Sequence, residues 1–437
     1  MMSRMHKPFE HLLRWMFDFV IVVLMMPVQL KGQGTARAIG MGWAYTAVAR
    51  GIHAPEWNPA NLGLPDNPKF SMTVISLGVG TWNNSFTKGM YDRYFVNGEK
   101  DQDGDIVWSQ QDVEDILNAI PDDGLGIDVT VSTRAFSFSV GRFALSVGAL
   151  AGSSFTLDRS LFKLALQGNE MGETYGLKNP DGFGLGIGLA SLSLGQPVKV
   201  GFADCFALGI SLNLLYGGAY GKVNQADFSL TTFDYGFDLD GKYEATYALG
   251  SLGWGLDIGM AAQSGNKWTL SVGLANVAGS IPWSNKVKKE MGYIRGDSLS
   301  VLDISEDDDE EDILEDSTWT VEMASFSEKL PAVLRLGMAF EEGPVLLTAD
   351  YCQGFQSGAF TSNKSQFAVG TEWRGIGWLP LRMGVVMGGR IGFGTSLGFG
   401  FRLGGFALDI GMMNRGFVSP QNSKGLVVAM EMGLGLH

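Results

Sequence analysis

The chain has 437 residues, of which 61 are glycine, and only 18% are charged, against roughly 25% in an average soluble protein. A formal net charge of −14 argues against nucleic acid as a partner. The two cysteines cannot build a disulfide framework, and the four histidines are too scattered for a zinc site or a His-based catalytic triad. We therefore expect a protein that is not an enzyme and that has no resident cofactor.

Residues 1–34 have the features of a secretory signal peptide. Arg4, Lys7 and Arg14 precede a short apolar core at residues 19–26, which Pro27 closes. A positive segment followed by a short apolar core is typical of export signals. An uncleaved signal anchor is the alternative.

Beyond residue 30 there is no apolar run of about 18 residues, so the sequence offers no transmembrane helix. Apolar residues instead alternate with small or polar ones in segments of about ten, which is typical of strands with one face toward lipid and the other toward a lumen. A closed sheet of such strands leaves no backbone group unpaired in hydrocarbon. We therefore predict an all-β fold, a transmembrane antiparallel β-barrel. It has about fourteen strands, at residues 70–80, 129–140, 143–152, 183–194, 205–221, 247–260, 267–275, 331–340, 343–352, 365–374, 380–388, 392–403, 405–414 and 425–436.

The connections between these segments alternate in length. Short turns follow the even-numbered strands, while long connections follow most odd-numbered ones, at residues 81–128, 153–182, 222–246 and 276–330. Outer-membrane barrels have short periplasmic turns and longer outer loops. We therefore expect residues 65–437 to form a barrel with these four long loops outside the cell, in the outer membrane of a Gram-negative-type bacterium. Extra pairing above the membrane is an alternative for residues 223–246.

The last segment predicts a register and a test of it. Val428, Met430, Met432 and Leu434 should face lipid, with Glu431 facing the lumen. On this register Met430→Arg should block assembly far more than Ala429→Arg.

The two cysteines should lie at opposite ends of the barrel. Cys205 opens the fifth strand and Cys352 closes the ninth. A disulfide needs Cα atoms within roughly 7 Å, so both thiols should stay free.

An acidic stretch resembles half of a calcium-binding loop. Glu99, Asp101, Asp103 and Asp105 are carboxylates at alternate positions, and Gly104 lies among them. The position where such a loop needs a bidentate glutamate holds glutamine instead. The alternative to a calcium site is an acidic surface loop that leads into a short helix over residues 109–120, capped by Ser109.

Three other patterns carry little functional weight. Residues 394–398 match the G-x-S-x-G of serine hydrolases, and residues 182–188 are glycine-rich like a dinucleotide loop, but both lie in alternating strands. The acidic run at residues 306–312 is typical of a solvated loop tip, with bridging to outer-leaflet lipids by divalent cations as the alternative.

Residues 36–64 read ARAIGMGWAYTAVARGIHAPEWNPANLGL, a stretch rich in small residues that ends in an Asn-Pro-Ala turn. This stretch resembles the N-terminal segment of the FadL-like outer-membrane proteins, including their PorV-type relatives. The stretches ILNAIPDDGL (116–125), GNEMGETYGL (168–177) and LPLRMGVVMGG (379–389) are similar to an uncharacterised branch of that superfamily. The resemblance implies that residues 35–64 form a hatch inside a fourteen-stranded barrel, with its key positions at Gly40, Met41, Gly42, Asn58, Pro59 and Ala60.

The resemblance also implies a function. We expect a channel that passes small hydrophobic molecules across the outer membrane, by binding in an apolar pocket and then displacing the hatch. Two alternatives stay open: a PorV-like partner for a secreted or surface protein, and a structural barrel without transport. The expected partners are outer-membrane lipid and a hydrophobic small molecule.

Overall fold

The computed structural model describes residues 35–436, except residues 103, 105, 179, 181, 202, 235, 266, 300–314, 357–360 and 418. The expected signal peptide and the acidic run at residues 306–312 therefore lie outside the described residues. No described helix is long and apolar enough to cross a membrane.

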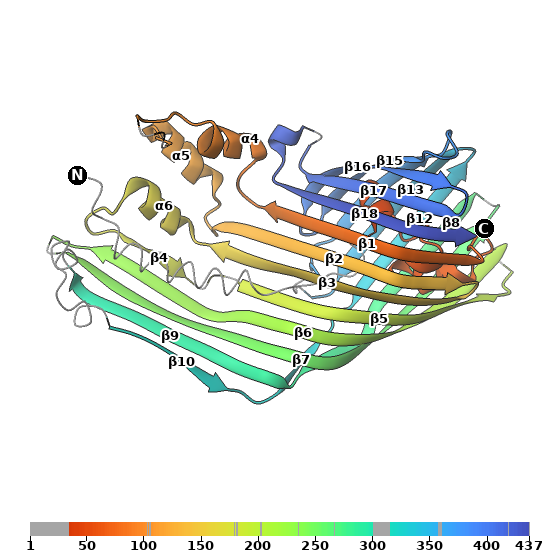
Figure 1. Cartoon of the computed structure of the whole chain (residues 1–437), viewed down its shortest axis with the longest axis horizontal. Coiled ribbons are helices and arrows are strands. Elements are labelled where there is room, and N and C mark those ends of the chain that lie inside the picture. Colours follow the sequence, from red (N-terminus) through yellow and green to blue (C-terminus); the bar gives the residue numbers. More distant parts are fainter. Residues whose placement is uncertain are drawn as a thin grey trace.

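Fourteen of the described strands close into one antiparallel barrel, as predicted (Figure 1). The barrel closes where the first and last of these strands pair, from Phe70 opposite Leu436 to Trp82 opposite Gly425. In order around the barrel the strands are β1 (Phe70–Asn83), β2 (Leu125–Val140), β3 (Phe143–Leu157), β5 (Gly182–Val198), β6 (Cys205–Thr232), β7 (Phe237–Ser264), β8 (Trp268–Trp283), β12 (Val333–Glu342), β13 (Val345–Gly354), β14 (Gln366–Trp373), β15 (Leu381–Gly388), β16 (Gly392–Leu403), β17 (Phe406–Arg415) and β18 (Gly425–Leu436).

The alternation in the sequence becomes an apolar outer face and a smaller, more polar inner face. In β6, Leu212 and Leu214 are exposed on the outside, whereas Ser211 and Asn213 are buried inside. An outer apolar face is what a strand in lipid requires.

The predicted register of β18 is confirmed. Val428, Met430 and Leu434 are exposed, whereas Glu431 is buried. Ala429 is on the inner face, is 1% exposed and packs in the same buried cluster as residues of the hatch segment. The expected difference between Met430→Arg and Ala429→Arg stays a prediction.

The segment at residues 222–246, expected to be a loop, is sheet instead. Strands β6 and β7 have 28 residues each, whereas a strand needs only about 9–11 residues to cross a bilayer. Their outer parts are joined by a tight turn in which Phe233 N–H donates to the Gly236 carbonyl. The extra pairing considered for this segment is therefore present.

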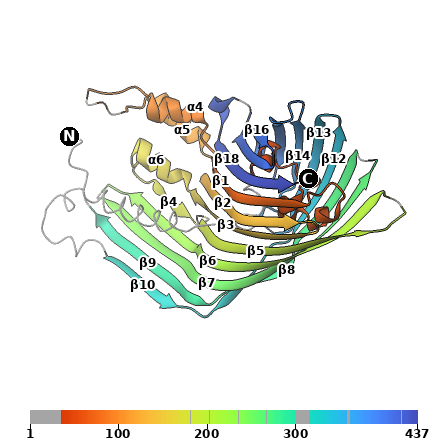
Figure 2. The ribbon, with the colours of Figure 1, turned by 45° about the vertical axis from the view of Figure 1, so that its right-hand side comes forward.

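Further strands extend this outer sheet. β4 (Thr174–Lys178) pairs with β6, β9 (Asn285–Leu299) pairs with β7, and β10 (Glu315–Glu322) pairs with β9. We call these three strands, with residues 222–232 of β6 and 237–247 of β7, the flange (Figures 1 and 2). Strand β11 (Phe326–Lys329) pairs with the outer end of β8, so the segment 276–330 is also largely sheet in its described part.

The connections at residues 81–128 and 153–182 carry short helices. These are α4 (Lys88–Tyr91), η3 (Asp92–Val96), α5 (Gln110–Ala119) and α6 (Arg159–Gln167). Ser109 caps α5, and its hydroxyl and the Asp112 carboxylate form a reciprocal capping box. The short helix predicted at residues 109–120 is therefore present.

Candidate functional site

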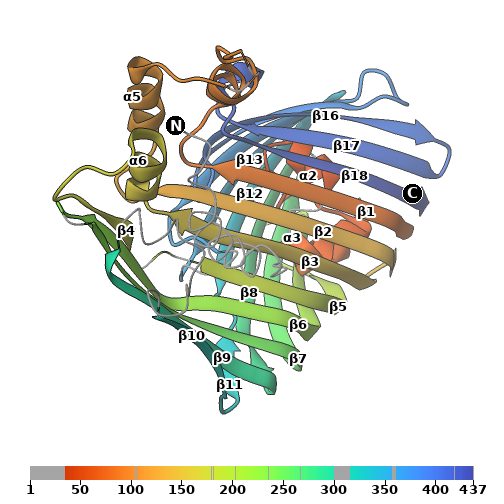
Figure 3. The ribbon, with the colours of Figure 1, turned by 60° about the vertical axis from the view of Figure 1, so that its left-hand side comes forward.

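Residues 35–64 lie inside the barrel, surrounded by its strands (Figure 3). They form α2 (Ala36–Gly40), η1 (Gly51–His53), α3 (Ala54–Trp57) and η2 (Pro59–Gly63). Nearly all of their side chains are buried. We call this segment the hatch.

Glycines in the wall let the hatch backbone approach closely. A Cβ atom on Gly370 would lie 2.4 Å from the Met41 carbonyl oxygen, and one on Gly384 would lie 2.4 Å from the Gly42 nitrogen. Gly42 itself has a φ of +65° and needs the conformational freedom of glycine. Gly40 meets the backbone of Gly398 in the same way. The abundance of glycine in the sequence therefore partly reflects hatch packing.

A buried ionic network holds the start of the hatch to the wall. Arg37 of α2 donates to both oxygens of Glu372 on β14, at 2.8 and 2.9 Å. Glu372 also accepts from Arg374 and Arg382, and Arg382 continues the network to Asp409 on β17 at 2.7 Å. Bidentate arginine–carboxylate pairs of this kind are geometrically specific. We call this network the ionic anchor.

An amide network holds the other end of the hatch. Asn58 caps η2 by accepting from the Ala60 N–H, and its amide group donates to Ser271 Oγ and to the Met260 carbonyl on the wall. Pro59 takes the first position of η2, where its missing N–H costs nothing. A Cβ on Gly209 of β6 would meet the Ala60 nitrogen at 2.0 Å. Asn58, Pro59 and Ala60 thus fix the hatch to β6, β7 and β8.

The middle of the hatch has a third set of contacts. Glu56 pairs with Arg134, and His53 Nε2 lies 3.4 Å from Glu431 Oε1. A bulge in β2 turns Arg134 inward and gives the next-but-one residue, Phe136, a φ of +50°. Burial lowers the pKa of His53, which favours its neutral form.

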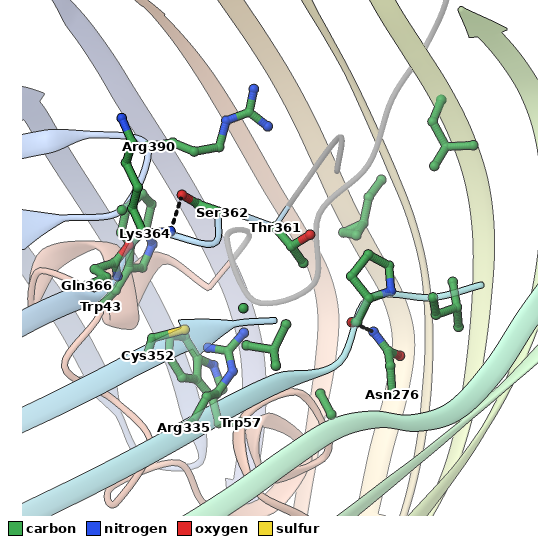
Figure 4. A pocket seen from close by; sticks show the side chains of 18 of the residues that line it. Trp43, Trp57, Asn276, Arg335, Cys352, Thr361, Ser362, Lys364, Gln366 and Arg390 are labelled. Atoms are coloured by element: carbon green, nitrogen blue, oxygen red, sulfur yellow. Dashed lines mark hydrogen bonds between the residues drawn. The ribbon is translucent and has the colours of Figure 1, made fainter. Parts of the chain in front are cut away.

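A cavity of about 220 Å³ lies between the hatch and the outer part of the barrel wall (Figure 4). One side is apolar and comes from β3, β5, β6 and β8. The other side is polar and comes from β12, β13, β14 and the connections near them. The apolar side comprises Leu150, Phe183, Leu185, Ile187, Leu189, Leu215 and Ile281, and the polar side includes Arg335, Asp350, Cys352, Lys364, Gln366 and Arg390.

Three tryptophans line the cavity where it meets the hatch. Trp43 and Trp57 belong to the hatch and Trp82 to β1, and each is less than 7% exposed. Within the described part of the chain, none of their indole N–H groups has a hydrogen-bond partner. Buried indole N–H groups normally find one, so these three donors are left unsatisfied by the surrounding protein.

Two charged residues connect this cavity to the hatch. The Arg335 guanidinium lies over the Trp57 ring, 4.7 Å from its centroid. Asp350 accepts from the backbone N–H groups of Tyr45 and Thr46 through Oδ2, at 3.0 and 2.7 Å. These two residues of the cavity wall are therefore in direct contact with residues 45, 46 and 57 of the hatch.

Several solved structures are similar to this chain over nearly its whole length. The Pseudomonas putida toluene transporter TodX superposes with a TM-score of 0.50 at 12% identity, over 93% of this chain and 99% of that one. The chain has the fold of that barrel. The Ralstonia pickettii toluene transporter TbuX gives a TM-score of 0.48 at 14% identity, over 93% of this chain and 99% of that one. A Pseudomonas aeruginosa FadL homologue gives a TM-score of 0.45 at 14% identity, over 94% of this chain and 99% of that one.

Comparisons of the sequence give less information than the comparisons with solved structures. Residues 234–412 match a family described as a family of unknown function, DUF5723. No curated protein matches the chain. The closed fourteen-stranded barrel that the resemblance of residues 36–64 implied is thus confirmed, whereas the relationship to PorV-type proteins and to an uncharacterised branch of the FadL-like superfamily stays a prediction.

The calcium hypothesis stays untested. Glu99 and Asp101 are exposed in the connection before α5, and Asp103 and Asp105 lie outside the described residues. Among the described residues, no group of three or more histidine, cysteine or acidic side chains is placed to hold a metal ion.

The cysteines are free, as predicted. Cys205 begins β6, whereas Cys352 lines the cavity.

Sequence reasoning missed the cavity residues Trp43 and Trp57. The signal available was two large aromatic side chains in a segment otherwise built from small residues.

Proposed function

We propose that the chain forms a passage for small hydrophobic molecules across the outer membrane. The observation that carries this proposal is the cavity, because it is apolar on one side and borders the hatch. Leu185, Ile187 and Leu189 of β5 supply the apolar surface.

The contacts of the hatch suggest how such a molecule would pass. The ionic anchor holds α2, and Asn58 holds η2, so these ends stay on the wall. Residues 41–48 lie between these two ends, and the backbone N–H groups of Tyr45 and Thr46 donate hydrogen bonds to Asp350. We expect these residues to move while both ends remain fixed. No covalent bond of the transported molecule is made or broken.

Filling the cavity should weaken the binding of a hydrophobic probe. Leu189→Trp adds a bulky ring to the apolar side, so the purified protein should bind the fluorophore N-phenyl-1-naphthylamine about tenfold more weakly, as measured by its fluorescence increase. Leu192→Trp is the matched control, because Leu192 lies on the same strand but is 59% exposed on the outer face. Equal binding by both variants would contradict the proposed site.

Removing the hatch should leave a folded but leaky barrel. After deletion of residues 35–58, Glu372 still pairs with Arg374 and Arg382, so the wall keeps its charge balance. A barrel of this size without its plug is an open aqueous channel. Planar-bilayer recordings should therefore show a large, persistent conductance. A deletion variant that folds and conducts no better than the full chain would show that the hatch is not the plug.

A partner for secreted or surface proteins is a second candidate, which the flange favours. Strands of 28 residues extend far beyond the membrane requirement. A channel alone does not need such a platform.

A further inference from the structure

Strand β10 forms the outermost edge of the flange. It pairs with β9 in continuous register, from Glu315 opposite Arg295 to Glu322 opposite Lys288. Among the described residues, β9 is the only strand that is paired with β10. Half of the backbone N–H and C=O groups of such a strand point away from the sheet and can pair with another chain.

This edge lacks lysine, proline and a bulge, three of the features by which proteins block edge pairing, and its charged residues are confined to its two ends. Natural edge strands carry lysine, proline or a bulge, or are very short. β10 has eight residues that read EDSTWTVE, without proline, lysine or arginine, and its register has no bulge. The edge is therefore open to an additional strand.

Exposed apolar side chains lie beside the open edge. Trp319 and Val321 are each 44% exposed, and Tyr293 of β9 packs its ring 6.2 Å from that of Trp319. Residues directly opposite in a sheet share a face, so Met291 lies on the Trp319 face as well. Half-exposed tryptophan and tyrosine are typical anchors of protein interfaces.

The charge of β10 selects the kind of partner. Glu315, Asp316 and Glu322 are exposed carboxylates near its two ends. Antiparallel pairing with a second copy pairs residues of one face with each other, and the register that places Asp316 opposite Glu322 brings like charges together, which is destabilising. A strand with lysine or arginine near its ends has the complementary charge.

The edge is also accessible. At about 3.3 Å per residue, the parts of β6 and β7 beyond the roughly ten residues that cross a bilayer reach far from the membrane surface. β10 joins the sheet through β9, which pairs with residues 237–249 in this outer part of β7.

We propose that β10 is a docking edge that binds an extended, basic segment of another protein as an additional strand. Its backbone groups supply the pairing, Trp319 and Tyr293 anchor the apolar side chains of the partner, and the carboxylates select lysine or arginine at the ends. This inference does not depend on whether the cavity binds a ligand.

The test uses the full chain in detergent and a fluorescein-labelled peptide, Lys-Thr-Val-Thr-Val-Thr-Val-Thr-Lys. Fluorescence anisotropy should show saturable binding in the micromolar range. The same peptide N-methylated at alternate residues cannot complete the ladder and should not bind. The peptide with both lysines replaced by glutamate should bind about tenfold more weakly.

Protein variants locate the site. Trp319→Ala should weaken binding about tenfold, which corresponds to ~1.4 kcal/mol. Trp254→Ala is the control, because Trp254 is similarly exposed, at 49%, but lies on the barrel wall. No binding, equal binding of the N-methylated peptide, or equal binding by Trp319→Ala would each overturn the proposal. A dimer in sedimentation that Trp319→Ala dissociates would assign the edge to a second copy instead.

Discussion

Glu372→Ala should destabilise the protein more than any other single substitution in the ionic anchor. Glu372 is 2% exposed and accepts hydrogen bonds from Arg37, Arg374 and Arg382. Without it, Arg37 and Arg382 lose their shared counter-charge in a buried site. Removing one partner of a buried ion pair typically costs about 3–5 kcal/mol.

The loss of stability in Glu372→Ala should appear in two measurements. Urea titration of the barrel in lipid vesicles should show a lower free energy of unfolding, and trypsin should cleave the hatch at Arg37 while the wall stays resistant. Glu341→Ala is the control, because Glu341 binds Arg374 at 2.7 Å but is 46% exposed. An exposed pair contributes about 0–1 kcal/mol. Similar losses in both variants would show that the network does not hold the hatch.

Met430→Arg should block assembly at the seam where the barrel closes. Met430 is 45% exposed on the outer face of β18, opposite Leu77 of β1 and Ile410 of β17. An arginine facing lipid at mid-membrane costs about 2–4 kcal/mol. The fraction of folded barrel in lipid vesicles, read from its heat-modifiable electrophoretic mobility, should fall sharply.

Met323→Arg provides a matched control. Met323 directly follows β10 in the chain and is similarly exposed, at 39%, but it belongs to the flange side of the molecule, in water. The same substitution there should change stability by less than about 0.5 kcal/mol. If both variants assembled equally well, the membrane boundary inferred here would be wrong.

The barrel could be predicted because lipid imposes a period of two on every strand that it contacts. Leu212 beside Ser211 and Met430 beside Glu431 carry that signal in the sequence. The side chains of β10 are nearly all exposed, so lipid does not impose alternation on them, and the segment between β8 and β12 looked like a loop. The length of β6 and β7 was also not predicted. A strand needs about 9–11 residues to cross a bilayer, and residues 222–246 extend the two strands beyond that length.

The position of the hatch inside the barrel could be predicted from the sequence, but its contacts with the wall could not. Asn58 was recognisable as a turn residue, yet its amide also bonds Ser271, 213 residues away in the sequence. Inward alternation places the Glu372 side chain in the lumen, but no local pattern indicates that Arg37 would meet it. The unpaired indoles of Trp43 and Trp57 depend on the three-dimensional packing of hatch and wall together.

The ionic anchor also sets an order of events during biogenesis. Arg37 and Glu372 are 335 residues apart, so Arg37 enters the periplasm long before its counter-charge is available. Any intermediate that lacks β14 has no carboxylate at this position for the hatch arginine, and β17, which supplies Asp409, follows later still. The hatch can thus lock only after β14, the tenth of the fourteen barrel strands, has been added. A chain truncated before β14 should keep its hatch accessible to protease, and protection of Arg37 then reports that β14 is in place.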